Sequence, residues 1–280
     1  AARTIEQMLN RLLCRHAAVQ HGIHRFGDRH GHALLLCKVI ARLGRVIALD
    51  RCTDLLHRLL RGRALADQDT GTAVFFVEMG EDARIDGAGL QATLETATRN
   101  AYASGYLRNS MCHPLTRANT GDNTPISLHL DLVAGDGLRI RFLPKGGGAE
   151  NMSRCAMFAP SRGISGIRDF VLDTVRQAGP NPCPPIIVGV GVGGTFDLAP
   201  TIAKKALLMP LDMPNPDPDA AALEAELLDA INRMPIGPGG LGGTRTCLGV
   251  RLLLRPCHIA SLPVAVNIQC NAARRGEICL

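Results

Sequence analysis

The stretch "NPCPPIIVGVGVGGTF", residues 181–196, combines three local signals. A cysteine and two prolines come first, then an apolar run that is typical of a buried strand, then alternating glycines. Gly189, Gly191 and Gly194 fit the G-x-G-x-x-G pattern, in which the backbone approaches a dinucleotide pyrophosphate. Two other interpretations are open: the glycines let a strand pack closely on a helix, or they form a bed around a group held by Cys183.

The dinucleotide interpretation requires a helix, a second strand and an acidic residue about 20 positions after the glycines. Asp212 stands near that distance. However, it belongs to "PLDMPNPDPD", residues 210–219, a proline-aspartate linker that is too rigid and polar for a strand. The surrounding sequence therefore disfavours a dinucleotide site.

Periodicity on either side of this stretch predicts a mixed fold. Residues 3–60 have apolar residues three and four positions apart, which favours helices. "ISLHLDLV" and "LRIRFL", within residues 126–143, alternate and predict a β-hairpin with one buried face. Further helices are expected at 88–106, 165–178, 197–208 and 219–234, and further strands at 73–77 and 185–190 and in "TCLGVRLLL" and "LPVAVNIQC". The expected architecture is one mixed α/β (α+β) domain, 1–280, whose helical N-terminal part covers 1–62.

Composition limits the classes of function. The net charge is +6, but basic residues are scattered among acids, aromatic residues make up 3% and Trp is absent, so nucleic-acid binding is not expected. Apolar runs stay well short of the roughly 18 residues that span a bilayer, and the polar start with Glu6 is unlike a signal peptide. The chain is therefore expected to be cytoplasmic, without a membrane partner. Its ten cysteines form no C-x-x-C, which disfavours a zinc ribbon.

Polar or glycine-rich loops flank most of the apolar strands. They are "DQDTG", "TGDNTP", "KGGGAEN", "NPCPPIIVGVGVGGTFD" and "GPGGLGG". Loops on a rigid scaffold are where binding and catalytic sites are built. Several such loops in one chain predict a large shared active site rather than a single phosphate cradle.

The motifs in and around these loops are specific enough to point to a family. "YLRNS", "TGDNTP", "PKGGGAENMSR", "CPPIIVGVGVGGTFDLAPTIAKKALL", "IGPGGLGG" and "HIASLPVAVNIQC" follow one another in the order and spacing of iron–sulfur hydro-lyases. Over roughly residues 63–275, the chain resembles the α subunit of two-subunit class I fumarases and L(+)-tartrate dehydratases.

This resemblance implies a [4Fe–4S] cluster that is held by three cysteines and leaves one iron open as a Lewis acid. Cys183 and Cys270 match two of the ligands. The third family cysteine belongs to a C-Q-D-T-G motif, and here Asp67 takes its place. Three interpretations are open: Asp67 ligates the cluster through oxygen, the chain holds a different metal or cluster, or cluster chemistry is lost in a divergent paralogue.

The resemblance also implies roles for other residues. A lone Arg or His is more often solvated or structural, so these roles rest on the motifs. Asp69 is expected in acid–base catalysis, and the expected substrate contacts are Gln68, Arg108, Gly147, Gly148 and His258.

The expected function is the reversible addition or removal of water on a small hydroxy-dicarboxylate, with the iron–sulfur cluster as Lewis acid. The expected assembly is with a β subunit as a two-fold αβ heterotetramer. The alternative is a paralogue that is non-catalytic or has changed chemistry.

Overall fold

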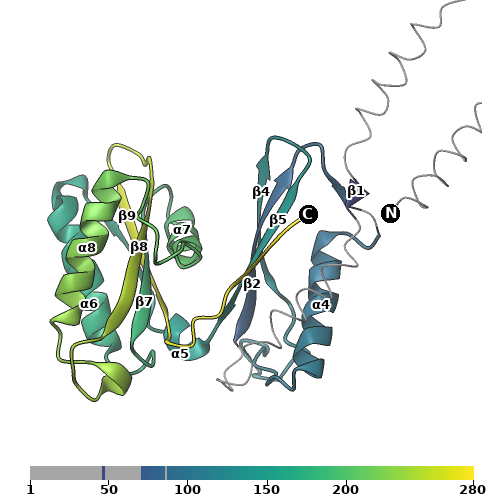
Figure 1. Cartoon of the computed structure of the whole chain (residues 1–280), viewed down its shortest axis with the longest axis horizontal. Helices are drawn as coiled ribbons and strands as arrows, with labels where there is room; N and C mark the ends of the chain where they lie inside the picture. The colour runs from purple at the N-terminus through teal and green to yellow at the C-terminus, as the bar shows by residue number, and fades with distance from the viewer. Residues whose placement is uncertain (1–45, 48–70, 86) are drawn as a thin grey trace, which may run out of the picture. The chain divides into compact units, whose positions relative to one another are not determined.

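The computed structural model describes residues 46–47, 71–85 and 87–280, all of which belong to the unit Arg45–Leu280. Apart from the two residues of β1, the helical region expected at 1–62 lies outside the described residues, as do Asp67, Gln68 and Asp69. The described part contains two four-stranded sheets and the helices that flank them (Figure 1). The expectation of a mixed α/β fold is confirmed.

The first sheet has the strand order β10-β5-β2-β4. Its strands are β2 (Thr72–Gly80), β4 (Ser127–Val133), β5 (Leu138–Lys145) and β10 (Gly276–Cys279). Helix α4 (Leu90–Ser104) covers one face, where Leu94 and Ala101 pack with Phe75 of β2. A separate two-residue pair joins β1 (Val46–Ile47) to β3 (Arg84–Ile85) in parallel.

The predicted hairpin of residues 126–143 is wrong. Both of its strands exist, but β2 lies between them, parallel to β4 and antiparallel to β5. β2 is apolar on both faces and therefore takes a central position, while β4 carries His129 and Asp131 on one face and takes the edge. Its other face is only partly covered, because Leu130 is 49% and Leu132 is 65% exposed.

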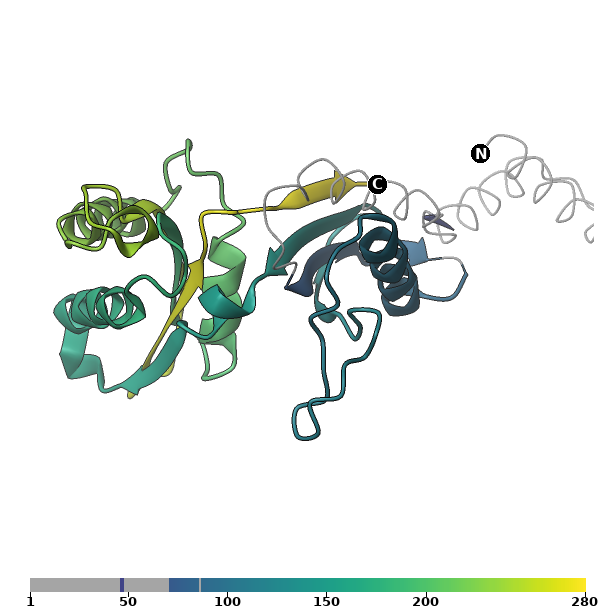
Figure 2. The ribbon, with the colours of Figure 1, turned by 90° about the horizontal axis from the view of Figure 1, so that it is seen from below.

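The second sheet has the strand order β6-β9-β7-β8. Its strands are β6 (Arg154–Phe158), β7 (Ile186–Gly193), β8 (Cys247–Arg255) and β9 (Leu262–Gln269). Helices α6 (Gly163–Ala178) and α8 (Pro218–Asn232) lie on one face and α7 (Leu198–Ala206) on the other (Figure 2). The main apolar core lies between β7, β8, β9 and the pair α6 and α8. None of the described helices has the length and apolar character needed to cross a bilayer.

The alternating glycines of the opening stretch belong to β7 and face α7. A Cβ on Gly189 would lie 2.2 Å from the carbonyl oxygen of Ala203, and one on Gly191 would lie 2.3 Å from that of Ala199. Close packing of a strand on a helix therefore accounts for Gly189 and Gly191. Both lie within β7 and not in a loop after it, as the dinucleotide pattern would require.

Candidate active site

The two predicted cysteine ligands lie at the same end of the second sheet. Cys183 precedes β7 and Cys270 follows β9, and these strands are antiparallel, with Ile187 opposite Gln269. The backbone N–H of Asn271 donates to the carbonyl of Cys183 at 3.3 Å, which joins the two segments directly. Cys183 is exposed and Cys270 is half-buried, so both thiols lie near the surface.

Cys183 has an unusual backbone conformation. Its φ is 53°, in the left-handed region that a residue with a Cβ enters only at a cost. Its N–H donates to the carbonyl of Pro180 at 3.0 Å and closes a tight turn. Strain of this kind is concentrated at functional sites, and here it fixes the position of a thiol at the strand end.

The glycine loop faces this turn. Gly147 and Gly148 begin the short helix α5 (Gly147–Glu150), directly after β5. A Cβ on Gly148 would come within 3.4 Å of the carbonyl oxygen of Asn181. Gly71, just before β2, packs so tightly against the carbonyl of Lys145 that any side chain would collide with it. Gly71 therefore fixes the start of β2 beside the glycine loop.

The segment with Arg108 is held at the same entrance to β2. The fully buried side chain of Asn123 donates to the carbonyl of Arg108 at 2.9 Å and accepts from the N–H of Met111 at 3.2 Å. The hydroxyl of Thr72, the first residue of β2, lies 3.4 Å from the sulfur of Met111. The structure therefore gives "TGDNTP" a clear role, because its Asn123 positions the exposed Arg108.

Asp122 of the same motif adds a charged anchor. Its carboxylate accepts from the hydroxyl of Thr124 at 2.7 Å and from the guanidinium of Arg99 at 2.6 Å. These hydrogen bonds, that of Thr124 first, lower the pKa of Asp122 to about 2. Asn123 therefore ties the motif to the Arg108 segment, and Asp122 ties it to Arg99 of α4.

Lys145 connects the glycine loop to the strand that ends at Cys270. Its side chain is almost fully buried, and its ammonium donates to the carbonyl of Ile268 and lies 3.5 Å from the carboxylate of Glu150. Burial lowers the pKa of Lys145 to about 8, although Glu150 acts in the opposite direction. Sequence reasoning missed this lysine, although it stands next to the glycines in "PKGGGAEN".

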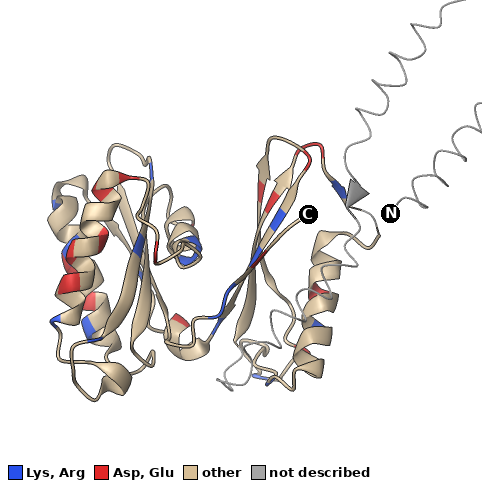
Figure 3. Ribbon diagram, viewed as in Figure 1, with Lys and Arg blue, Asp and Glu red and all other residues tan. Residues whose placement is uncertain are grey.

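Glu150 is shared between two cations. Its carboxylate also accepts from the ammonium of Lys204 on α7 and from the side-chain amide of Asn267 at 3.1 Å. Burial raises the pKa of Glu150, but Lys145 and Lys204 outweigh this effect and leave it below its usual value. α7 ends in two adjacent basic residues, Lys204 and Lys205 (Figure 3), and Lys205 pairs with Asp131 of β4 at 2.6 Å.

His258 lies at the opposite end of the sheet. It belongs to the loop between β8 and β9, next to the last residues of β7, where Gly194 donates to the carbonyl of Pro256. The eight residues of β9 separate His258 from Cys270 by roughly 25 Å along the sheet. Its imidazole is exposed and its Nδ1 accepts from the N–H of Ala260 at 3.1 Å. One chain therefore does not bring His258 to the other predicted site residues.

The donor atoms at the cysteine end fit part of an iron–sulfur site. Cys183, which is exposed, and Cys270, which is half-buried, lie at the same end of the second sheet, and the buried ammonium of Lys145 interacts with Cys270. Among the described residues, no group of three or more His, Cys, Asp or Glu side chains is placed to hold a metal ion. Cys183 and Cys270 can therefore supply two ligands, and a third has to come from another segment.

Comparison with known proteins gives the class of this two-sheet α/β protein: the chain is a hydro-lyase. The family model described as fumarate hydratase (Fumerase) matches residues 62–279, and the chain belongs to this family. The family resemblance predicted from the motifs is confirmed.

Known relatives agree with the family match. A Methanocaldococcus jannaschii protein provisionally named L(+)-tartrate dehydratase subunit alpha is 44% identical over 217 residues, which are 75% of this chain and 75% of the relative. The L(+)-tartrate dehydratase subunit alpha of Escherichia coli (strain K12) is 34% identical over 217 residues, 76% of this chain and 71% of the relative. The protein of that name in Shigella sonnei is equally similar.

Proposed function

We propose that this chain is the α subunit of a two-subunit enzyme that adds or removes water on a small hydroxy-dicarboxylate. Relatives named as L(+)-tartrate dehydratase α subunits support the reaction class and the subunit type. The observation that carries the proposal is the convergence at one end of the fold: the Cys183 turn, the end of β9 at Cys270, the glycine loop and the Arg108 segment.

The proposed cofactor is an iron–sulfur cluster held by Cys183, Cys270 and Asp67. When bound, such a cluster supplies an open iron that polarises the substrate hydroxyl as a Lewis acid. Asp67 precedes the described Gly71 by four positions in the sequence, and Gly71 packs on Lys145, which directly precedes the glycine loop. This proximity along the chain supports Asp67 as the third ligand. A divergent paralogue without the cluster is the alternative that the Asp67 replacement keeps open.

The chain's own residues would bind and orient the substrate. The exposed guanidinium of Arg108 suits a two-pronged contact with a carboxylate, and the buried Asn123 holds its backbone in place. The backbone N–H groups of Gly147 and Gly148 would donate to a carboxylate oxygen, with Gln68 as a further donor. Asp69 would take the proton α to the carboxylate during dehydration.

The geometry of His258 supports a two-fold assembly. Because one chain holds His258 roughly 25 Å from the cysteines, its proposed contact with substrate requires a second α copy. The relatives are named as α subunits, which implies a β subunit, and this partner would complete each site. An αβ heterotetramer with two equivalent sites satisfies both requirements.

The deciding test is the iron and sulfide content of the chain, co-expressed with a β subunit and reconstituted without oxygen. We expect stoichiometric iron and sulfide in the wild type, loss of both in Cys183→Ser and Cys270→Ser, and no change in Cys279→Ser, a matched control at another exposed thiol. A wild-type complex that takes up no iron would remove cluster chemistry and leave the divergent paralogue.

The Asp67→Cys variant tests the third ligand. A carboxylate is a harder donor than a thiolate and holds an iron–sulfur cluster less tightly. We therefore expect Asp67→Cys to retain its cluster longer than wild type when both are exposed to a chelator or to air. Identical rates of iron loss in the two forms would show that residue 67 is not a ligand.

A further inference from the structure

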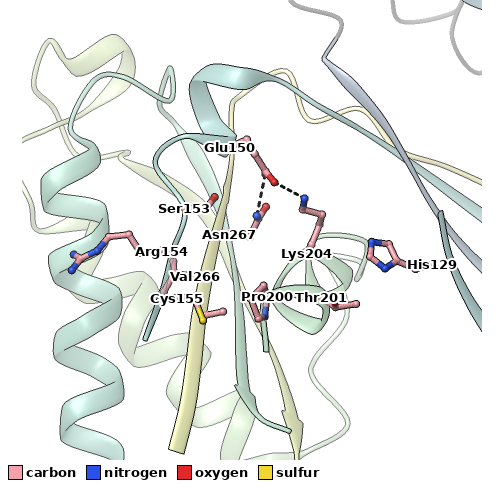
Figure 4. A pocket seen from close by; sticks show the side chains of 12 residues that line it. His129, Glu150, Ser153, Arg154, Cys155, Pro200, Thr201, Lys204, Val266 and Asn267 are labelled. Carbon is pink, nitrogen blue, oxygen red and sulfur yellow. Dashed lines mark hydrogen bonds and ion pairs between the residues drawn. The ribbon is translucent and has the colours of Figure 1, made fainter. Parts of the chain in front are cut away.

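A second site is formed on the α7 face of the second sheet. A cavity of about 320 Å³ lies there, between α7, the edge strand β6 and β9 (Figure 4). Its lining contains none of the described residues predicted for the active site. We call it the α7 cavity and define it by Cys155, Thr201, Lys204, Ala265 and Asn267.

Asn267 lines this cavity and has an unused hydrogen-bond acceptor. Its side chain is only 6% exposed, and its amide nitrogen donates to Glu150 at 3.1 Å. Its carbonyl oxygen is buried and has no hydrogen-bond partner. A buried acceptor without a donor destabilises the folded chain. A ligand with an O–H or N–H group would remove this cost by donating to the oxygen.

The charges around the cavity leave one positive charge unbalanced. The carboxylate of Glu150 pairs with the ammonium groups of Lys145 and Lys204. These one negative and two positive formal charges sum to +1. Arg154 also lines the cavity but is paired with Asp173 at 2.7 Å. The ammonium of Lys204 has three N–H donors, and its described contact with Glu150 uses one of them.

An imidazole, that of His129, also lines the cavity. His129 belongs to β4 and stacks on Phe76, with ring centroids 4.6 Å apart. Burial, followed by the charge of Lys204, lowers the pKa of His129 below its usual value, although Asp131 acts in the opposite direction. The ammonium of Lys204 in the cavity wall therefore favours an anion over a second cation.

We propose that the α7 cavity binds a small hydroxycarboxylate. The carboxylate contacts Lys204, and the hydroxyl donates to the side-chain oxygen of Asn267 once this buried side chain turns toward the cavity. The floor of Cys155 and Ala265, which stand opposite each other on β6 and β9, supplies a partly apolar surface for the carbon chain. This site is separate from the cysteine end and does not depend on the cluster.

The arrangement predicts discrimination between a hydroxy acid and its dehydrated product. L-malate and L(+)-tartrate each carry a hydroxyl that can donate to the Asn267 oxygen. Fumarate and succinate carry no hydroxyl. One additional hydrogen bond corresponds to about three- to tenfold tighter binding. A ligand on Lys204 would also compete with Glu150, which is bound to Lys145 beneath the glycine loop.

Calorimetric titration of the full chain with L-malate and succinate tests the proposal. An Arg108→Ala background removes the proposed carboxylate contact at the active site, so the remaining binding reports the α7 cavity. We expect saturable L-malate binding that is about ten- to a hundredfold weaker in Lys204→Met, because a hydrogen bond to a charged group is lost. The matched control is Lys205→Met, which removes the neighbouring ammonium that pairs with Asp131 instead.

Cys155→Phe is the second variant. It fills the cavity from an exposed position on an edge strand and leaves the contacts of Glu150 intact. We expect it to abolish L-malate binding without lowering the melting temperature. The proposal is overturned by absence of saturable binding in the Arg108→Ala chain, by equal affinities for L-malate and succinate, or by equal losses in Lys204→Met and Lys205→Met.

A carboxylate side chain of the β subunit could offer the same chemistry. The titration is therefore repeated with the assembled complex. Retained L-malate binding supports the small-molecule site, whereas loss of binding on assembly assigns the α7 cavity to the partner and overturns the proposal.

Discussion

The ammonium of Lys145 lies in the protein interior between the glycine loop and the strand that ends at Cys270. Lys145→Met removes this charge with little change in volume. Glu150 keeps Lys204 and Asn267, so we expect a loss of only about 1 kcal/mol in the free energy of unfolding. We expect a larger loss of iron and sulfide, because the end of β9 is no longer tied to the glycine loop.

The measurement compares iron per chain with the urea unfolding midpoint in three variants. Lys145→Arg keeps a cation and should recover part of the iron content, and Lys205→Met should match wild type because it lies outside this network. If Lys145→Met binds as much iron as wild type, the lysine does not position the site.

His129 predicts a pH dependence of stability near neutrality. Burial, with Lys204 and Lys205, lowers the pKa of this imidazole in the folded chain below its unfolded value of 6.5. As the pH falls through 6.5, the unfolded chain therefore binds a proton before the folded chain does, and unfolding becomes more favourable. This loss is complete once the pH lies below the folded pKa.

His129→Gln should remove part of this dependence. We expect the free energy of unfolding of wild type to fall more steeply between neutral and mildly acidic pH than that of the variant. Urea unfolding at several pH values in that range measures the difference. Parallel curves for the two proteins would show that His129 titrates alike in the folded and unfolded chains.

The contact of β7 with α7 depends on two glycines that allow no side chain. A Cβ on Gly191 would collide with the backbone of Ala199 on α7, and backbone cannot rotate away as a side chain can. We expect Gly191→Ala to cost about 1–3 kcal/mol in the free energy of unfolding. Gly137→Ala is the control, because its Cβ would meet only Leu280 at an ordinary 3.8 Å, and a similar loss in both would argue against the packing role.

These elements show what local sequence can and cannot predict. The periods of α4, α6, α7 and α8 were visible because each helix buries one apolar face. Alternation also identified β4 and β5 as strands, but alternation specifies faces and not neighbours. The insertion of β2 between them depends on residues about 50 positions away, which a local pattern does not contain.

The candidate site shows the same division. The motifs placed Cys183, Cys270, Gly147 and Arg108 in segments that the structure brings to one end of the fold. The supporting contacts of Lys145 and Glu150 were not predicted, because most of them connect segments that are distant in the sequence. The bond from Lys145 to Ile268 spans 123 positions, and that from Lys204 to Glu150 spans 54. Roles that depend on such distant partners require the fold.

The assembly of the complete enzyme determines where His258 acts. Within one chain it lies at the far end of the second sheet from Cys270, so a chain that supplied both to one site would have to refold. The proposed two-fold pair of α subunits needs no such change, since each copy would supply His258 to the cysteine end of the other. Exposed Phe196 and Ile259, at 66% and 91%, lie at the His258 end and give such a contact an apolar component.

Co-expression of two inactive variants distinguishes these arrangements. His258→Ala and Cys270→Ser each remove one contribution, and we expect each alone to have little dehydratase activity with the β subunit. In a mixed pair of the two, one of the two sites combines the intact cysteines of one copy with the intact His258 of the other, so about half of the sites in such pairs are restored. The measurement is the dehydration rate per iron for differently tagged variants, purified through both tags to select mixed pairs. Without any recovery in the mixed pairs, His258 either acts within its own chain or has no part in the reaction, and the two-fold arrangement of the site would be wrong.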